Sequence, residues 1–125
     1  MIKTSLLVTI GILVCLGGCR ANGAEMNDAK ANQIADAIKQ IENSSKYPYG
    51  VKSLPIKGNN QIEREAYGRK ICINTIKLNY QRWQNTDKSI DYLTFLGLYY
   101  CPNVEGNRQS YTNWIRNIHA LIKVN

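Results

Sequence analysis

The chain changes direction at residues 41–51, which read IENSSKYPYGV. An amphipathic helical pattern precedes this stretch and ends in it, because the Pro-Tyr-Gly segment cannot continue a helix. One carboxylate, Glu42, stands where the helix ends. The negative end of the helix dipole and desolvation by Tyr47 and Tyr49 would both favour its neutral form. Cleavage of a glycosidic bond needs such a proton donor, so Glu42 is the candidate catalytic acid. A solvated residue before an ordinary turn is the alternative.

The N-terminal region has the features of a secretory signal peptide. A positive start at Lys3 precedes an apolar run over residues 5–16, which is too short for a stable membrane span. We therefore expect residues 1–18 to be a signal peptide and residues 19–27 to be a lipid anchor and tether. Residues 28–125 remain, which is enough for one small domain but not for two.

Two cleavage sites remain open for this signal peptide. The segment Leu16-Gly17-Gly18-Cys19 resembles a bacterial lipobox, in which Cys19 becomes the lipidated first residue. Cleavage after Gly23 or Ala24 would instead release a soluble protein. Either site predicts export to the periplasm or cell envelope, and the first adds a lipid anchor in the membrane.

The charge of the chain predicts an anionic partner. The whole sequence has a net charge of +7, and Lys3 is the only charged residue before Cys19, so 15 basic and 9 acidic residues remain (+6). Such a balance suits a phospholipid surface or the bacterial cell wall, and export argues against nucleic acid. The basic residues are dispersed, so a merely solvated basic surface is an equal alternative.

Cysteine and histidine are too few to predict a metal site. With Cys15 and Cys19 assigned to export, Cys72 and Cys101 remain, and in an oxidising compartment such a pair predicts one disulfide. It would close a loop of about 30 residues and contribute about 3–4 kcal/mol. Two free buried thiols are the alternative. One histidine, His119, completes no ligand set and is expected to be structural.

Apolar periodicity predicts a mainly α-helical domain of four or five helices, with a short loop or hairpin over residues 51–60 after the first helix. The first helix is expected from Asn27 or Asp28 to about Asn43, and the second from Gln61 to Trp83. The third is expected to be capped by Asp87 or Ser89 and to end at about Tyr100. The last is expected to be capped by Ser110 or Thr112. The second helix is expected to be central, because Ile62, Ile71, Cys72 and Leu78 widen its apolar stripe.

Several blocks together resemble a family of small bacterial and phage proteins with lysozyme-like, lytic-transglycosylase-like domains. They are residues 41–44 with 47–51, 69–76 with Arg82-Trp83, 92–97, 100–102 and 113–118. The resemblance covers residues 34–118. It implies a lysozyme-like helical fold and a monomeric enzyme that needs no cofactor and acts on peptidoglycan glycan strands.

In the larger transglycosylase group, a helix ends in a catalytic Glu that is closely followed by Ser. Glu42 matches that Glu and Ser44 matches that Ser, with Asn43 inserted between them. Further candidate substrate contacts, through stacking and hydrogen bonds to sugar hydroxyls and peptide carboxylates, are Ser44, Tyr47, Tyr49, Arg69 and Asn74. The chain departs from the pattern in two ways: residues 52–54 stand where Gly-Leu-Met-Gln is usual, and the Ala-Tyr-Asn-Ala-Gly block is absent.

The implied reaction cleaves the bond between N-acetylmuramic acid and N-acetylglucosamine, with Glu42 as acid and then as base. Hydrolysis would need a second carboxylate, for which Glu65 is the leading candidate. Because of the departures, a non-catalytic envelope lipoprotein or binding module of the same fold remains open. A third alternative is a secreted protein that protects against an effector or inhibits a lysozyme.

Overall fold

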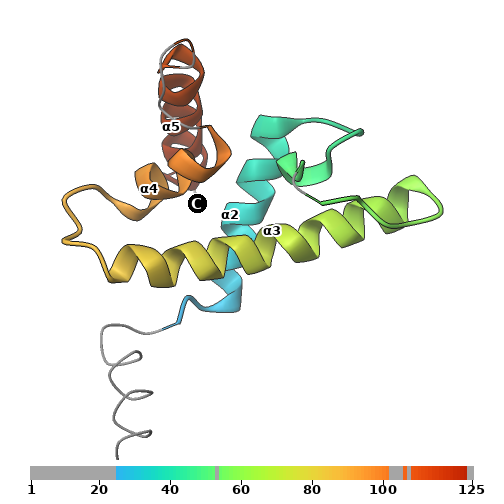
Figure 1. The fold of residues 1–125 in the computed structure, drawn as a ribbon, viewed down its shortest axis with the longest axis horizontal. Helices are drawn as coiled ribbons and strands as arrows, with labels where there is room; N and C mark the ends of the chain where they lie inside the picture. The colour runs from blue at the N-terminus through green and yellow to red at the C-terminus, as the bar shows by residue number, and fades with distance from the viewer. Residues whose placement is uncertain (1–24, 53, 102–105, 107, 124–125) are drawn as a thin grey trace, which may run out of the picture.

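A computed structural model describes residues 25–52, 54–101, 106 and 108–123. These residues form four α-helices and one short 3₁₀ turn: α2 (Asp28–Glu42), η1 (Pro48–Gly50), α3 (Gln61–Gln84), α4 (Tyr92–Tyr100) and α5 (Arg108–Lys123) (Figure 1). No strand occurs among them, so the predicted mainly helical class is confirmed. The described part of the stretch 51–60 is a loop and not a hairpin.

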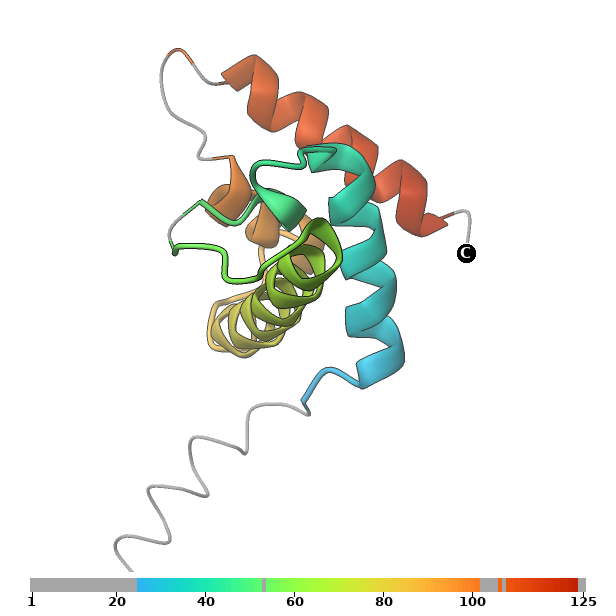
Figure 2. The same cartoon turned by 90° about the vertical axis from the view of Figure 1, so that its right-hand side faces the viewer.

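The core lies where the four helices meet. Each helix contributes at least one fully buried side chain, namely Ile34 and Ile38 of α2, Cys72 and Ile76 of α3, Leu96 of α4 and Ile118 of α5. Helix α2 packs against α3, α5 and η1, and Figure 2 shows α3 and α5 on different sides of it. Helix α2 is therefore the centre of the domain, and the longer α3, which the sequence predicts to be central, lies across it.

Helix α2 begins and ends at the predicted positions. The Asn27 side chain accepts a hydrogen bond from the Lys30 amide at 2.7 Å, as an N-cap residue does. At the other end, Asn43 adopts a left-handed conformation (φ 41°, ψ 50°) and its amide donates to Lys39 O at 2.9 Å. This is the usual way in which a helix stops, and it leaves Glu42 as the last helical residue.

Helix α3 has nearly the predicted bounds but a narrower buried face. Its N-terminus is capped by Asn60, which accepts from the Glu63 amide at 2.9 Å. Its buried residues are Gly68, Cys72, Ile76 and Asn79, which form a single stripe. Ile62 is 81% exposed and Leu78 is 48% exposed, so the predicted widening of the stripe by these two residues is wrong.

The predicted caps of the last two helices are also wrong. Helix α4 begins at Tyr92 and is capped by Asp91, which accepts from the Thr94 amide at 3.0 Å. Asp87 instead accepts from the Ser89 amide within its own turn. Helix α5 begins at Arg108, before either predicted cap. Several good capping residues follow one another here, and packing decides which of them is used.

The predicted disulfide is wrong, because both cysteines are free thiols. Cys72 is fully buried on α3, and its sulfur lies 3.4 Å from the hydroxyl oxygen of Tyr100. Cys101 follows Tyr100 at the end of α4 and is half-buried. Successive residues there point in different directions, so the tyrosine and not the cysteine occupies the contact with Cys72.

The folded core includes a residue that precedes α2. Met26 is 8% exposed and belongs to the core, although the sequence predicts a tether over residues 19–27. The predicted signal peptide, its cleavage sites and the lipidation site Cys19 lie outside the described residues. Among the helices that the structure describes, none combines the length and apolar character needed to cross a membrane.

Candidate active site

The turn after α2 brings the chain back onto Glu42. The hydroxyl of Ser44 accepts a hydrogen bond from the Tyr47 amide at 3.0 Å. The 3₁₀ turn then closes when Val51 N donates to Pro48 O at 3.2 Å. Two tight turns in eight residues therefore place η1 beside the helix end that it follows.

Gly50 lies close to the carboxylate. It has a φ of +70°, and a Cβ at this position would lie 2.5 Å from Glu42 Oε1. The position therefore excludes other residues for two reasons, namely the left-handed backbone and the lack of space. The glycine of the Pro-Tyr-Gly segment thus serves the site as well as the turn.

Glu42 and Gly50 line a cavity of about 290 Å³. Its other lining residues are Val51, Lys52, Ile71, Thr75, Tyr99 and Tyr100. They come from the loop after η1, from α3 and from α4. Glu42 is the one acidic residue among these lining residues, and the Glu42 side chain is only partly buried. The cavity therefore exposes a single carboxylate to a ligand.

One oxygen of this carboxylate has a fixed partner. Nε1 of Trp114, on α5, donates a hydrogen bond to Glu42 Oε2 at 3.1 Å. The indole is 4% exposed and stacks on Tyr100, with ring centroids 5.4 Å apart and planes 11° apart. The carboxylate at the end of α2 is therefore held by α5, and the holding ring is supported by α4.

The Cys72 thiol and the Tyr100 hydroxyl, which contact each other next to this stack, are both neutral. Burial raises the pKa of the Cys72 thiol to about 11, and the nearby charge of Glu42 adds to the effect. Burial likewise raises the pKa of Tyr100 far above its ordinary value. A thiol held in its neutral form is a poor nucleophile. Cys72 therefore packs against Tyr100 and is not a nucleophile.

The other candidate carboxylates lie elsewhere. Glu65 is 3.7 Å from Lys39 Nζ and lines a separate hollow of about 150 Å³ with Ser44 and Tyr49. Glu63 accepts from the Asn59 amide at the start of α3. Neither lines the cavity of Glu42. The fold therefore does not bring Glu65, the leading candidate for a second carboxylate, into the cavity of Glu42.

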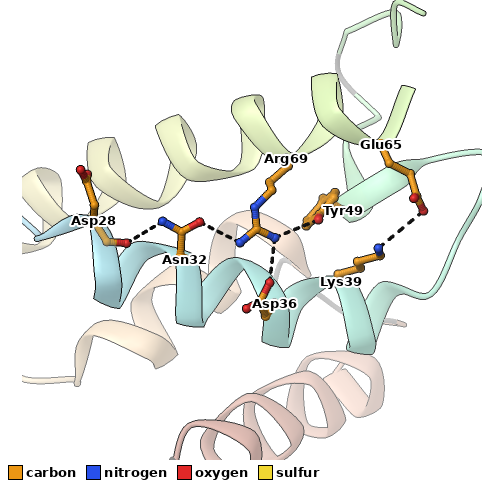
Figure 3. A network of polar contacts seen from close by, with 7 residues as sticks. All are labelled: Asp28, Asn32, Asp36, Lys39, Tyr49, Glu65 and Arg69. Carbon is orange, nitrogen blue, oxygen red and sulfur yellow. Dashed lines mark hydrogen bonds and ion pairs between the residues drawn. The ribbon is translucent and has the colours of Figure 1, made fainter. Parts of the chain in front are cut away.

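Arg69 and Tyr49 form a different polar cluster, which Figure 3 shows between α2 and α3. Arg69 donates to Asp36 Oδ1 at 2.7 Å, to Tyr49 Oη at 3.0 Å and to Asn32 Oδ1 at 2.7 Å. The hydrogen bond with Tyr49 is the largest cause that raises the pKa of the Arg69 guanidinium. These two predicted substrate contacts are thus occupied by each other and by α2, outside the residues that line the cavity.

The remaining predicted contacts have mixed positions. Asn74 is exposed on α3 and does not line the cavity. Tyr47 is half-buried and has two cations near its ring, with Lys46 Nζ 5.3 Å and Lys52 Nζ 5.8 Å from the ring centroid. Because Lys52 also lines the cavity, Tyr47 connects to the site through this lysine.

A second cavity of about 570 Å³ lies at the other end of α2, where Met26, Ile34, Trp83 and Tyr92 are among its lining residues. It contains a contact between His119 and Asp91 that the sequence did not reveal. His119 Nε2 is 3.0 Å from Asp91 Oδ1, and His119 Nδ1 is 2.8 Å from Ile115 O. Both ring nitrogens and the capping carboxylate are thus engaged, so this pair is no free acid or base.

In the described ranges, no three His, Cys, Asp or Glu side chains come together in a way that could hold a metal ion. Comparisons with family models, with curated proteins and with solved structures found no significant match to this chain. Sequence reasoning singled out Glu42 but assigned no site role to Lys52, Trp114 or Tyr100, because no local signal in the sequence marks them.

Proposed function

We propose that this protein is an exported peptidoglycan-cleaving enzyme of the lytic-transglycosylase type, with Glu42 as its acid and base. One observation carries the proposal. A single carboxylate lines a cavity, with one oxygen held by Trp114 and with no second acid among the described residues around it. A lytic transglycosylase needs one such group, whereas a hydrolase of the usual kind needs two.

The reaction follows from that single group. Glu42 in its protonated form donates its proton to the oxygen that bridges the two sugars, and the bond from the anomeric carbon to this oxygen breaks. The C6 hydroxyl of the muramyl unit attacks the anomeric carbon and closes a ring. The carboxylate takes the proton of that hydroxyl, so Glu42 returns to its starting form. No water is consumed, and the product carries an anhydromuramyl end.

Other lining residues suit a glycan strand with peptide side chains. Tyr99 is 48% exposed at the cavity and offers a ring face for stacking on a sugar. Lys52 is exposed there and offers a cation to peptide carboxylates. Thr75 adds a hydroxyl from α3. Export to the cell envelope, with a lipid on Cys19 as the anchor, belongs to the same proposal and would bring the cavity to its substrate.

Replacement of Glu42 tests the proposal directly. We expect the purified protein to release soluble anhydromuramyl fragments from peptidoglycan, and Glu42→Gln to lower the rate by about 10²-fold or more, because the amide has no proton to transfer. Glutamine keeps the size of the side chain and an oxygen that can accept from Trp114. Mass spectrometry of the released fragments identifies the product.

The matched control is Glu65→Gln, which removes an acid that lines a different hollow. It should cleave at the wild-type rate. Absence of release by a folded wild-type protein would refute the proposal and would favour a wall-binding or protein-binding module of the envelope. Fragments with reducing ends would indicate hydrolysis and a second carboxylate. Equal activity of the Glu42→Gln protein would show that Glu42 is not the acid.

A further inference from the structure

The Trp114 ring is held on several sides. Its ring is 4% exposed and stacks on Tyr100. On the α4 side, a Cβ at Gly97 would lie 3.2 Å from Trp114 Cε3, so the absence of a side chain there lets the indole lie against α4. The indole N–H therefore has a fixed position and direction.

From this arrangement we propose that Trp114 is a positioning residue that assigns the transferable proton to Glu42 Oε1. This inference rests on the proposed function of Glu42. The indole nitrogen is a donor only, so Oε2 can face it only as an acceptor. A proton on Oε2 would compete with the indole N–H for the same lone-pair region. The proton therefore belongs on Oε1, the oxygen beside Gly50, which itself lines the cavity.

The same hydrogen bond suits the second half of the proposed reaction. A donor to a carboxylate favours its charged form. The carboxylate must act as a base in the second half of the proposed reaction. Trp114 would thus keep Glu42 able to release its proton as well as to hold it.

A second layer supports the indole. The ring of Tyr100 stacks on Trp114, and its hydroxyl lies 3.4 Å from the sulfur of Cys72. Cys72 is fully buried on α3. The positioning of Glu42 therefore draws on all four helices: the acid on α2, the donor on α5, the supporting ring on α4 and the buried thiol on α3.

Trp114→Phe separates positioning from packing. Phenylalanine retains an aromatic ring that can stack on Tyr100 but has no N–H. We expect the midpoint of the Glu42 titration, followed by the ¹³C signal of its side-chain carboxyl carbon, to rise, because the charged carboxylate loses a hydrogen-bond donor. The pH profile of peptidoglycan release should move upward with it. A purely structural tryptophan would lower stability without moving either midpoint.

The chain offers a matched control, because it contains only one other tryptophan. Trp83 lines the larger cavity and donates its indole N–H to Ile90 O at 2.8 Å. Trp83→Phe should therefore leave the titration of Glu42 unchanged. If Trp114→Phe does not fold, the wild-type protein still supplies a test: the Trp114 indole proton resonance should shift with the Glu42 titration.

The outcomes distinguish this inference from the proposed function. If Trp114→Phe raises the Glu42 midpoint but the wild-type protein releases nothing from peptidoglycan, the positioning role stands and the proposed reaction fails. If the wild type cleaves peptidoglycan but neither the midpoint nor the pH profile changes in Trp114→Phe, the inference is overturned. An indole resonance that does not respond to the Glu42 titration overturns it as well.

Discussion

Gly50 provides the space in which the Glu42 carboxylate lies. At this position a side chain would meet both a positive φ of +70° and the carboxylate itself, 2.5 Å from a Cβ. The two costs are separable in this chain. Gly106 has a similar φ of +84°, but a Cβ there would have no neighbour within 4 Å. A comparison of the two positions thus measures what the contact with Glu42 adds.

We expect Gly50→Ala to lower the free energy of unfolding by about 1–3 kcal/mol and to displace Glu42 from its hydrogen bond with Trp114. Gly106→Ala should cost less, because it carries the backbone strain alone. Urea unfolding of both variants measures the difference. An equal decrease in the free energy of unfolding in the two variants would mean that the Glu42 carboxylate moves away from the new methyl group without loss of stability.

At the scale of the elements, Arg69 ties three of them together. Its guanidinium on α3 reaches Asp36 and Asn32 on α2 and the ring hydroxyl of Tyr49 on η1. Arg69 also lies over the Tyr49 ring, with the guanidinium carbon 5.7 Å from the ring centroid. Gly50 of η1 lines the cavity. The cluster in Figure 3 therefore holds in place a segment that forms part of the cavity wall.

Arg69→Gln should lower the free energy of unfolding by about 1–2 kcal/mol, an amount reduced by the partial exposure of the ion pair. Thermal unfolding measures it. Lys70→Gln, at the exposed neighbouring position of α3, controls for the loss of one positive charge. Unchanged stability would contradict the supporting role.

At the scale of the whole molecule, contacts between helices favour the charged form of two carboxylates, Asp28 and Asp91. A hydrogen bond from Lys77 on α3 lowers the pKa of Asp28 at the start of α2. Burial opposes the shift at Asp91, but hydrogen bonds from Thr94 and from His119 on α5 lower the pKa of this carboxyl. The contact of Lys77 with Asp28 joins α3 to α2, and the contact of His119 with Asp91 joins α5 to the start of α4.

The direction of these shifts predicts a loss of stability in acid. A folded-state pKa below the unfolded value of about 3.9 stabilises the fold above that pH, and this contribution disappears as the pH falls through the folded-state pKa. We therefore expect the free energy of unfolding, measured with urea, to decrease between about pH 5 and pH 2. Asp91→Asn keeps a capping residue and should reduce this dependence. A profile that stays flat below pH 5 would contradict the prediction.

The sequence alone determined the local features of this protein. It predicted α2 and α3 to within about a residue at each end, because caps such as Asn27 and Asn60 and a Pro-Tyr-Gly break act within one turn of helix. It also identified Glu42 as the carboxylate at a helix end. It did not identify the start of α4, where Asp87, Ser89 and Asp91 all suit a cap and only packing separates them.

Only the tertiary structure decided which distant side chains meet. Trp114 reaches Glu42 from 72 residues away, Tyr100 rather than Cys101 faces Cys72, and Arg69 turns to Asp36 instead of the cavity. Periodicity indicates which face of a helix is buried, but it does not indicate which partner that face meets. The partner depends on how the helices cross and on which side chains fit at the crossing. The carboxylate could therefore be found in the sequence, whereas the groups that hold it could not.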